Sequence, residues 1–155
     1  MKTNNQLNIE VEKLHQRLND LEHAKNYFQG DTENLIGKQV YEQEWLGTIE
    51  YSLELENEIL EATEVEIEKL MEDASIGIEQ EAVLKDALDY ATGERESEEG
   101  RLTYQQIRDE LIENSPGLKN EIKRVTENQI LEDINKTVWE LKNTRKKTQV
   151  HCNSF

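Results

Sequence analysis

The sequence predicts an all-α protein, an elongated antiparallel helical bundle or coiled coil of about five helices. Glycine and proline are scarce, at seven and one in 155 residues, and the stretches between them repeat apolar residues at spacings of three and four. Because 34% of the residues are charged and 35% hydrophobic, apolar side chains must gather on one face of each helix. We expect one helical domain over residues 1–147 and a disordered tail over 148–155, where the repeat ends.

The first predicted helix covers residues 4–28 and resembles a coiled-coil seam. Its apolar residues recur at alternating steps of four and three, as in a heptad repeat, with Lys25 in the apolar place expected after Leu21. They are Leu7, Val11, Leu14, Leu18, Leu21 and Phe28. Leu14 and Leu18 need a covering helix, either from the same chain or from a second copy. The regular spacing favours self-association, with a dimer as the preferred state.

The second predicted helix covers residues 33–73, capped by Asp31 or Thr32 and bent or interrupted at Gly37 or Gly47. Its apolar residues fall on one side of a helical wheel. Six glutamates fall on the other side and are the candidate partner contacts: Glu50, Glu54, Glu58, Glu61, Glu68 and Glu72.

Two features of this stretch leave alternatives open. Residues 48–55 alternate apolar and polar side chains, as a half-buried strand would, although their Glu and Leu content favours a helix. Glu56 falls in the middle of the apolar sector, where a carboxylate must be paired, protonated or exposed by a bend. It is either an interface contact that sets register or the edge of a groove facing water.

Three further helices are expected in the remainder of the chain. One follows Gly77, and the next is capped by Thr103 after a loop over residues 93–100. The last begins at Ser115 and Pro116, a capping hydroxyl followed by a proline at the first helical position. It ends in the basic run Arg145-Lys146-Lys147, which complements the negative end of a helix dipole.

The charge predicts the chemistry of the partner. With 34 acidic and 18 basic residues the formal net charge is −16, which repels nucleic acid and anionic lipid and favours a protein with a basic surface. No uncharged apolar run approaches the roughly 20 residues that span a bilayer, and the N-terminus lacks an apolar signal-peptide core. The lone Cys152 excludes an intramolecular disulfide. Together these features predict a cytoplasmic protein without membrane contact.

No residue pattern indicates catalysis, a cofactor or a metal. Glu12 and His15 form a single Glu-x-x-His pair, whereas di-metal bundles use one pair on each of two helices. His151 and Cys152 are neighbours in the expected tail, which cannot hold the geometry of nucleophilic attack. No glycine-rich loop is suited to a phosphate. We therefore expect a protein that is not an enzyme.

The function predicted from these patterns is an adaptor or inhibitor that binds a protein partner through helix faces. The alternative is a nucleic-acid mimic of the phage or mobile-element type, which blocks the basic cleft of a DNA- or RNA-handling enzyme. Between residues 42 and 73 there are twelve acidic residues and one basic residue. On a helix rising about 1.5 Å per residue, this places one charge every ~4 Å, close to the ~3.4 Å between phosphates in a DNA strand.

Overall fold

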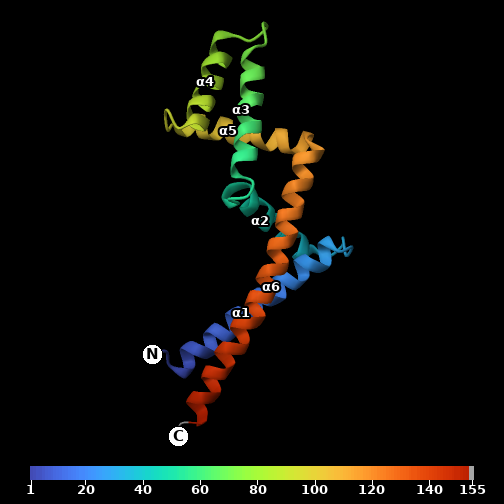
Figure 1. Ribbon diagram of the computed structural model, residues 1–155, viewed down its shortest axis with the longest axis vertical. Coiled ribbons are helices and arrows are strands. Elements are labelled where there is room, and N and C mark those ends of the chain that lie inside the picture. Colours follow the sequence, from blue (N-terminus) through green and yellow to red (C-terminus); the bar gives the residue numbers. More distant parts are fainter. Residues whose placement is uncertain (154–155) are drawn as a thin grey trace. The chain divides into compact units, whose positions relative to one another are not determined.

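The structure, a computed structural model, is all-α, as the sequence predicts (Figure 1). It describes the backbone of residues 1–153 and the side chains of residues 1–147. Six helices occupy the described backbone: α1 (Asn4–Phe28), α2 (Leu35–Tyr51), α3 (Glu56–Met71), α4 (Ile78–Thr92), α5 (Glu98–Asn114) and α6 (Pro116–Asn153). None of them, over the part described, is long and apolar enough to cross a membrane.

The tail predicted over residues 148–155 overlaps the end of helix α6. The helix continues past the basic run and ends at Asn153, and Ser154 and Phe155 lie outside the described residues. At its other end, α6 begins at Pro116 as predicted, and Ser115 Oγ accepts a long hydrogen bond of 3.5 Å from the backbone N–H of Leu118.

The chain divides into two compact units. Unit 1 comprises Met1–Gly47 and Lys123–Phe155, and unit 2 comprises Thr48–Ile122. Helices α2 and α6 each contribute residues to both units. The core of unit 1 is built around Leu21, Ala24 and Ile130, and that of unit 2 around Ile67, Ala87 and Tyr104.

In unit 1, the heptad seam of α1 packs within the chain. Leu21 and Ala24 form one buried cluster with Ile130 of α6, and at the other end the Arg145 guanidinium lies 2.6 Å from His15 Nε2. Higher numbers in α1 thus meet lower numbers in α6, so the two helices are antiparallel (Figure 1).

The burial of the seam residues supports this intrachain packing. Two of them, Leu7 and Leu21, are buried in a single copy of the chain, and the other four are partly buried: Val11, Leu14, Leu18 and Phe28. Another helix of the chain therefore covers much of the seam, which leaves less of it for a second copy.

A glycine permits the close crossing of α1 and α2 in unit 1. A Cβ on Gly37 would lie 2.1 Å from the backbone oxygen of His23, which no side chain could tolerate without movement of the helices. Asn34 precedes the helix and caps it, in place of the predicted Asp31 or Thr32, because its Oδ1 accepts from the N–H of Gly37 at 2.9 Å. The Asn34 amide also lies 3.0 Å from His23 Nδ1. Gly37 is therefore a packing glycine inside α2, not a bend.

Tyr41 is the aromatic centre of unit 1. Its ring lies 5.5 Å from that of Tyr27 and 6.1 Å from that of Phe28, centroid to centroid. Burial raises the pKa of Tyr41 to about 12, and the nearby Glu127 carboxylate and Tyr27 phenol act in the same direction. Burial also raises the pKa of Glu127.

The predicted helix over 33–73 is broken between Tyr51 and Glu56, a position marked by neither glycine nor proline. A continuous helix would bury Leu53 and carry the Glu56 carboxylate into the core. The break instead buries Leu55 to 1% exposure and leaves Leu53 87% exposed, and Glu56 faces solvent in the first turn of α3. The exposed position of Glu56 avoids the cost of desolvating its carboxylate. Residues 48–55 contain no strand, so that alternative is wrong.

Helices α4 and α5 also cross at a glycine. Ser97 caps α5 by accepting from the N–H of Gly100 at 2.9 Å, so the helix starts five residues before the predicted cap at Thr103. A Cβ on Gly100 would lie 2.6 Å from the Asp86 carbonyl oxygen. The loop expected over 93–100 is therefore shorter, because Gly100 serves helix packing; Gly93, with a φ of +77°, ends α4.

We predict that Gly37→Ala lowers the free energy of unfolding by about 1–3 kcal/mol, the usual cost of overpacking a tight contact. Gly47→Ala is the matched control, because it lies in the same helix and an added Cβ there would meet nothing within 4 Å. It should raise stability by about 0.5–1 kcal/mol through helix propensity. Urea unfolding followed by circular dichroism measures both, and equal effects at the two sites would contradict the close crossing.

A second prediction concerns alkaline pH. The pKa of Tyr41 is higher in the folded state, at about 12, than the value of about 10 expected when unfolded. The folded state therefore holds this proton more tightly, and stability falls as pH rises from about 10 to 12. Wild type should lose roughly 1–2 kcal/mol more than Tyr41→Phe over this window, a value reduced for partial exposure of the ring. Parallel pH profiles in urea unfolding would show that Tyr41 is not responsible.

Candidate functional site

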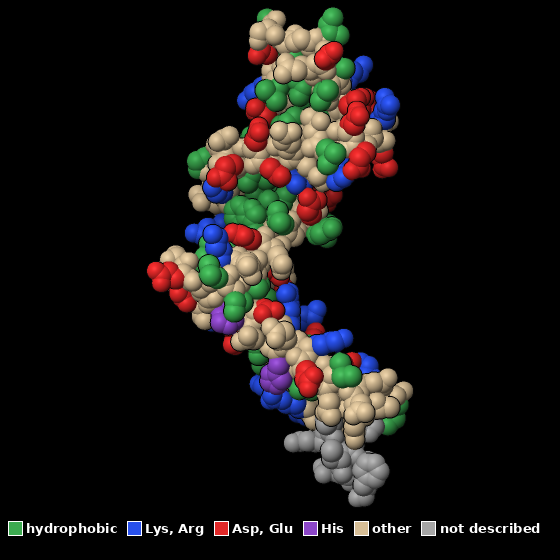
Figure 2. All heavy atoms as spheres, turned by 180° about the vertical axis from the view of Figure 1, so that it is seen from behind, with side chains coloured by type: hydrophobic (Ala, Val, Ile, Leu, Met, Phe, Trp, Pro, Cys, Tyr) green, Lys and Arg blue, Asp and Glu red, His purple; other side chains and the backbone are tan. Residues whose placement is uncertain are grey.

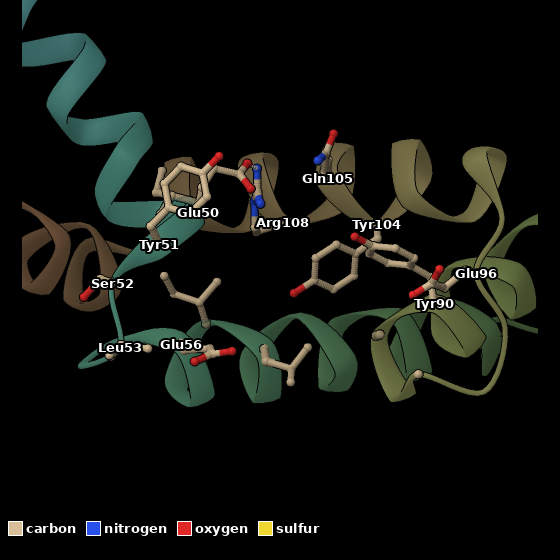
Figure 3. A pocket seen from close by; sticks show the side chains of 15 residues that line it. Glu50, Tyr51, Ser52, Leu53, Glu56, Tyr90, Glu96, Tyr104, Gln105 and Arg108 are labelled. Carbon is tan, nitrogen blue, oxygen red and sulfur yellow. Dashed lines mark hydrogen bonds and ion pairs between the residues drawn. The ribbon is translucent and has the colours of Figure 1, made fainter.

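Unit 2 contains an open cleft where the break between α2 and α3 leaves space beside α5 and the end of α4 (Figure 3). Its volume is about 510 Å³, within the range of small-ligand and side-chain binding sites. We call it the α2–α3 cleft. Apolar side chains form part of its wall, namely Ile49, Leu53, Ile59, Leu60 and Ala91. The polar and aromatic lining comprises Glu50, Tyr51, Ser52, Glu56, Tyr90, Glu96, Tyr104, Gln105 and Arg108.

Arg108 is the buried charge of the cleft. Its side chain is 8% exposed, and its Nη2 donates to Glu50 Oε1 at 2.9 Å and lies 3.1 Å from Asp109 Oδ1. A buried guanidinium requires such partners, because an unpaired charge in this position would be strongly destabilising. Figure 3 shows the Glu50 carboxylate directed toward Arg108. The pair connects the last turn of α2 to α5.

Two tyrosines from different helices form the inner wall of the cleft. The rings of Tyr90 and Tyr104 lie 5.4 Å apart at an angle of 56°, a favourable tilted arrangement. Burial raises the pKa of Tyr104, although a side-chain hydrogen bond with Thr63 and the charge of Arg108 oppose the shift. Tyr104 is therefore a neutral phenol at physiological pH, with its ring in the core.

The mouth of the cleft is apolar and acidic. Tyr51 is 83% exposed and Leu53 87% exposed, so two large apolar side chains, two residues apart in the sequence, face solvent. Glu56 and Glu96 are also exposed, and neither has an ion-pair partner among the residues described. This combination of exposed aromatic, aliphatic and unpaired acidic groups is suited to binding rather than to folding.

All six glutamates of the predicted acidic face are exposed, but they do not share one helix. Glu50 belongs to α2, Glu54 to the break and Glu72 to the end of α3. The other three, Glu58, Glu61 and Glu68, lie along α3 itself. The helix predicted over residues 33–73 is interrupted before Glu56, so these glutamates are divided between α2, the break and α3. Glu50 is also paired with Arg108.

The net charge of the protein is located in unit 2. This unit has 22 acidic and 6 basic residues, whereas unit 1 has 12 of each, so the formal charge of −16 belongs to unit 2 alone. Figure 2 shows acidic side chains spread over the face of this unit that is drawn. The acidic excess of the chain is therefore confined to unit 2, and unit 1 is electrically neutral.

No metal centre is found in the part of the chain that the structure describes, where no three His, Cys, Asp or Glu side chains are grouped for an ion. Glu12 and His15 are exposed on α1, and His15 faces Arg145. His151 and Cys152 have no described side chains.

Arg108 and Tyr104 were not predicted as site residues, although the sequence carries a signal for Arg108. In α5, Arg108 follows Tyr104 by four residues and Ile107 by one, so it falls within the apolar stripe of that helix. A charged residue in an apolar stripe is the same anomaly that drew attention to Glu56.

We predict that Glu50→Gln lowers the free energy of unfolding by about 1 kcal/mol, since the buried Arg108 would lose a charged acceptor that is itself partly exposed. Glu58→Gln, at an exposed position of α3, should leave stability nearly unchanged. Urea unfolding of the two variants at neutral pH makes the comparison. Equal, negligible effects would show that the Glu50–Arg108 pair does not hold α2 against α5.

No protein-family model, curated protein or solved structure matches this chain. The function proposed below therefore depends on the α2–α3 cleft, its charges and the exposure of its side chains.

Proposed function

We propose that this protein is a non-enzymatic interaction module that binds a protein partner through unit 2, in the manner of an adaptor or inhibitor. The observation that carries the proposal is the exposure of Tyr51 and Leu53 at the mouth of an acidic cleft. Aromatic anchors near a desolvated pocket supply most of the energy in protein interfaces. These two side chains contribute little to the fold, since both face solvent.

The charge of unit 2 favours a partner with a basic surface. An excess of 16 acidic residues creates a field that attracts a basic surface and accelerates its approach. Glu56 and Glu96 lie at the cleft itself, where they can pair with lysine or arginine on the partner. The cleft volume of about 510 Å³ accommodates an apolar anchor side chain between them.

Nucleic-acid mimicry is the second candidate, and the exposure of Glu58, Glu61 and Glu68 along α3 supports it. Two observations weigh against it. The acidic array is interrupted at the α2–α3 break, and Val65, 50% exposed, lies among the glutamates of α3. An apolar side chain in that position has no counterpart in a row of phosphates.

The proposal is tested by placing a photo-crosslinking amino acid at Tyr51 in the native host, with Ile78 as the control position. Ile78 is 88% exposed and belongs to the same unit but lies outside the α2–α3 cleft. We expect a crosslinked partner from position 51 and none from position 78, because the contact is made at the cleft. Mass spectrometry identifies the partner, and equal crosslinking from both positions would contradict the proposal.

Binding of the purified partner then separates the two candidates. Under the adaptor proposal, Tyr51→Ala with Leu53→Ala weakens binding at least tenfold, while Glu58→Gln, Glu61→Gln and Glu68→Gln together change it little. Under mimicry the glutamine variant weakens binding strongly, and wild-type affinity falls steeply with added salt, because many exposed charges are screened.

A further inference from the structure

The outer face of α6 in unit 1 is basic and aromatic. Trp139 is 66% exposed. The exposed Lys136 lies three residues before it, and the exposed Lys142 and Lys146 lie three and seven residues after it, so all four share one face of the helix. The opposite face is buried, with Ile130, Thr137 and Leu141. We call the exposed group, Lys136, Trp139, Lys142 and Lys146, the Trp139 stripe.

The lysines of the Trp139 stripe are available to bind a partner. None of its three lysines has an ion-pair partner among the residues whose side chains are described. An exposed tryptophan flanked by cations on a helix is typical of the helix-in-groove mode of recognition, in which the helix inserts an aromatic anchor into an apolar groove. Figure 2 shows basic side chains near the described end of this helix. A complementary surface must be apolar at its centre and acidic at its rim.

The distribution of charge along the chain indicates the occupant. The Trp139 stripe lies in unit 1, which has 12 acidic and 12 basic residues, whereas unit 2 has 22 acidic and 6 basic residues, so unit 2 of a second copy attracts the basic stripe. The α2–α3 cleft has the required chemistry, with Tyr51 and Leu53 at its mouth and unpaired carboxylates on Glu56 and Glu96.

We infer that the Trp139 stripe of one copy binds the α2–α3 cleft of a second copy, head to tail. The indole packs against Tyr51 and Leu53, and the lysines pair with the carboxylates at the rim. Two chains of like charge repel at long range, but at about 0.1 M salt the screening length is about 10 Å, so local complementarity governs the contact.

The two surfaces differ, so the contact is heterologous and leaves one stripe and one cleft free at the ends of each assembly. The inference goes beyond the proposed function, because it assigns a second binding surface. It also predicts competition: a cleft occupied by another copy cannot bind the partner.

Sedimentation velocity of the full chain over a micromolar concentration range tests self-association. We expect the mass to rise above 18.2 kDa with concentration. Trp139→Ala should weaken association by roughly 30-fold or more, as expected for a central aromatic anchor. Ile9→Ala, at an exposed position of α1 in the same unit, is the control and should not change it. A wild-type mass that stays constant with concentration, or equal effects of the two variants, would overturn the inference.

Mixing two defective variants tests the head-to-tail arrangement. The stripe variant carries Trp139→Ala with Lys142→Glu, and the cleft variant carries Tyr51→Ala, Leu53→Ala and Glu56→Lys. Each should be monomeric alone and helical by circular dichroism, and the mixture should form 1:1 dimers, because each retains the surface that the other lacks. Failure to form dimers would overturn the pairing of stripe with cleft. Self-association needs no foreign protein, so its failure is distinguishable from failure of the crosslinking test at Tyr51.

Discussion

Unit 2 is organised by the need to pair a buried guanidinium. Arg108 lies within the apolar stripe of α5, where an isolated charge would be strongly destabilising, and Glu50 supplies the acceptor from the last turn of α2. The end of α2 is thereby held next to α5. The following residues must leave the helix direction so that Leu55, rather than Glu56, enters the core. The α2–α3 cleft is the space that this change of direction creates.

The same constraint determines which side chains lie at the surface of the cleft. Leu53 would be a core residue in a continuous helix, but the break leaves it exposed beside Tyr51. The carboxylate of Glu56, which could not be buried without a large desolvation cost, becomes part of the rim. A packing requirement of the fold has thus placed apolar and acidic groups together on the surface.

Local sequence chemistry predicted three of the helices well, whereas the caps predicted for α2 and α5 were wrong. Helix α1 was placed by its heptads, α4 by Gly77, and α6 by the capping Ser115 with Pro116. The break after Tyr51 is marked by neither glycine nor proline, and its position also depends on the packing of the apolar stripe of α3 against α4 and α5. For the site, the exposure of the six glutamates was foreseen, and Glu56 was recognised as anomalous. Tyr90, Tyr104 and Arg108 come from other helices, and only packing brings them to the cleft.

Two glycines have consequences for how such a chain can diverge. At Gly37 and Gly100 a Cβ would meet a backbone oxygen of the neighbouring helix, whereas at Gly47, Gly77 and Gly117 it would meet nothing within 4 Å. Selection should therefore retain glycine at positions 37 and 100, whereas substitutions at positions 47, 77 and 117 should be tolerated. A distant descendant that shares little other sequence would still carry glycine three residues after an Asn cap and three after a Ser cap. That spacing is a more durable signature of the fold than its glutamates, which are replaceable wherever they only face water.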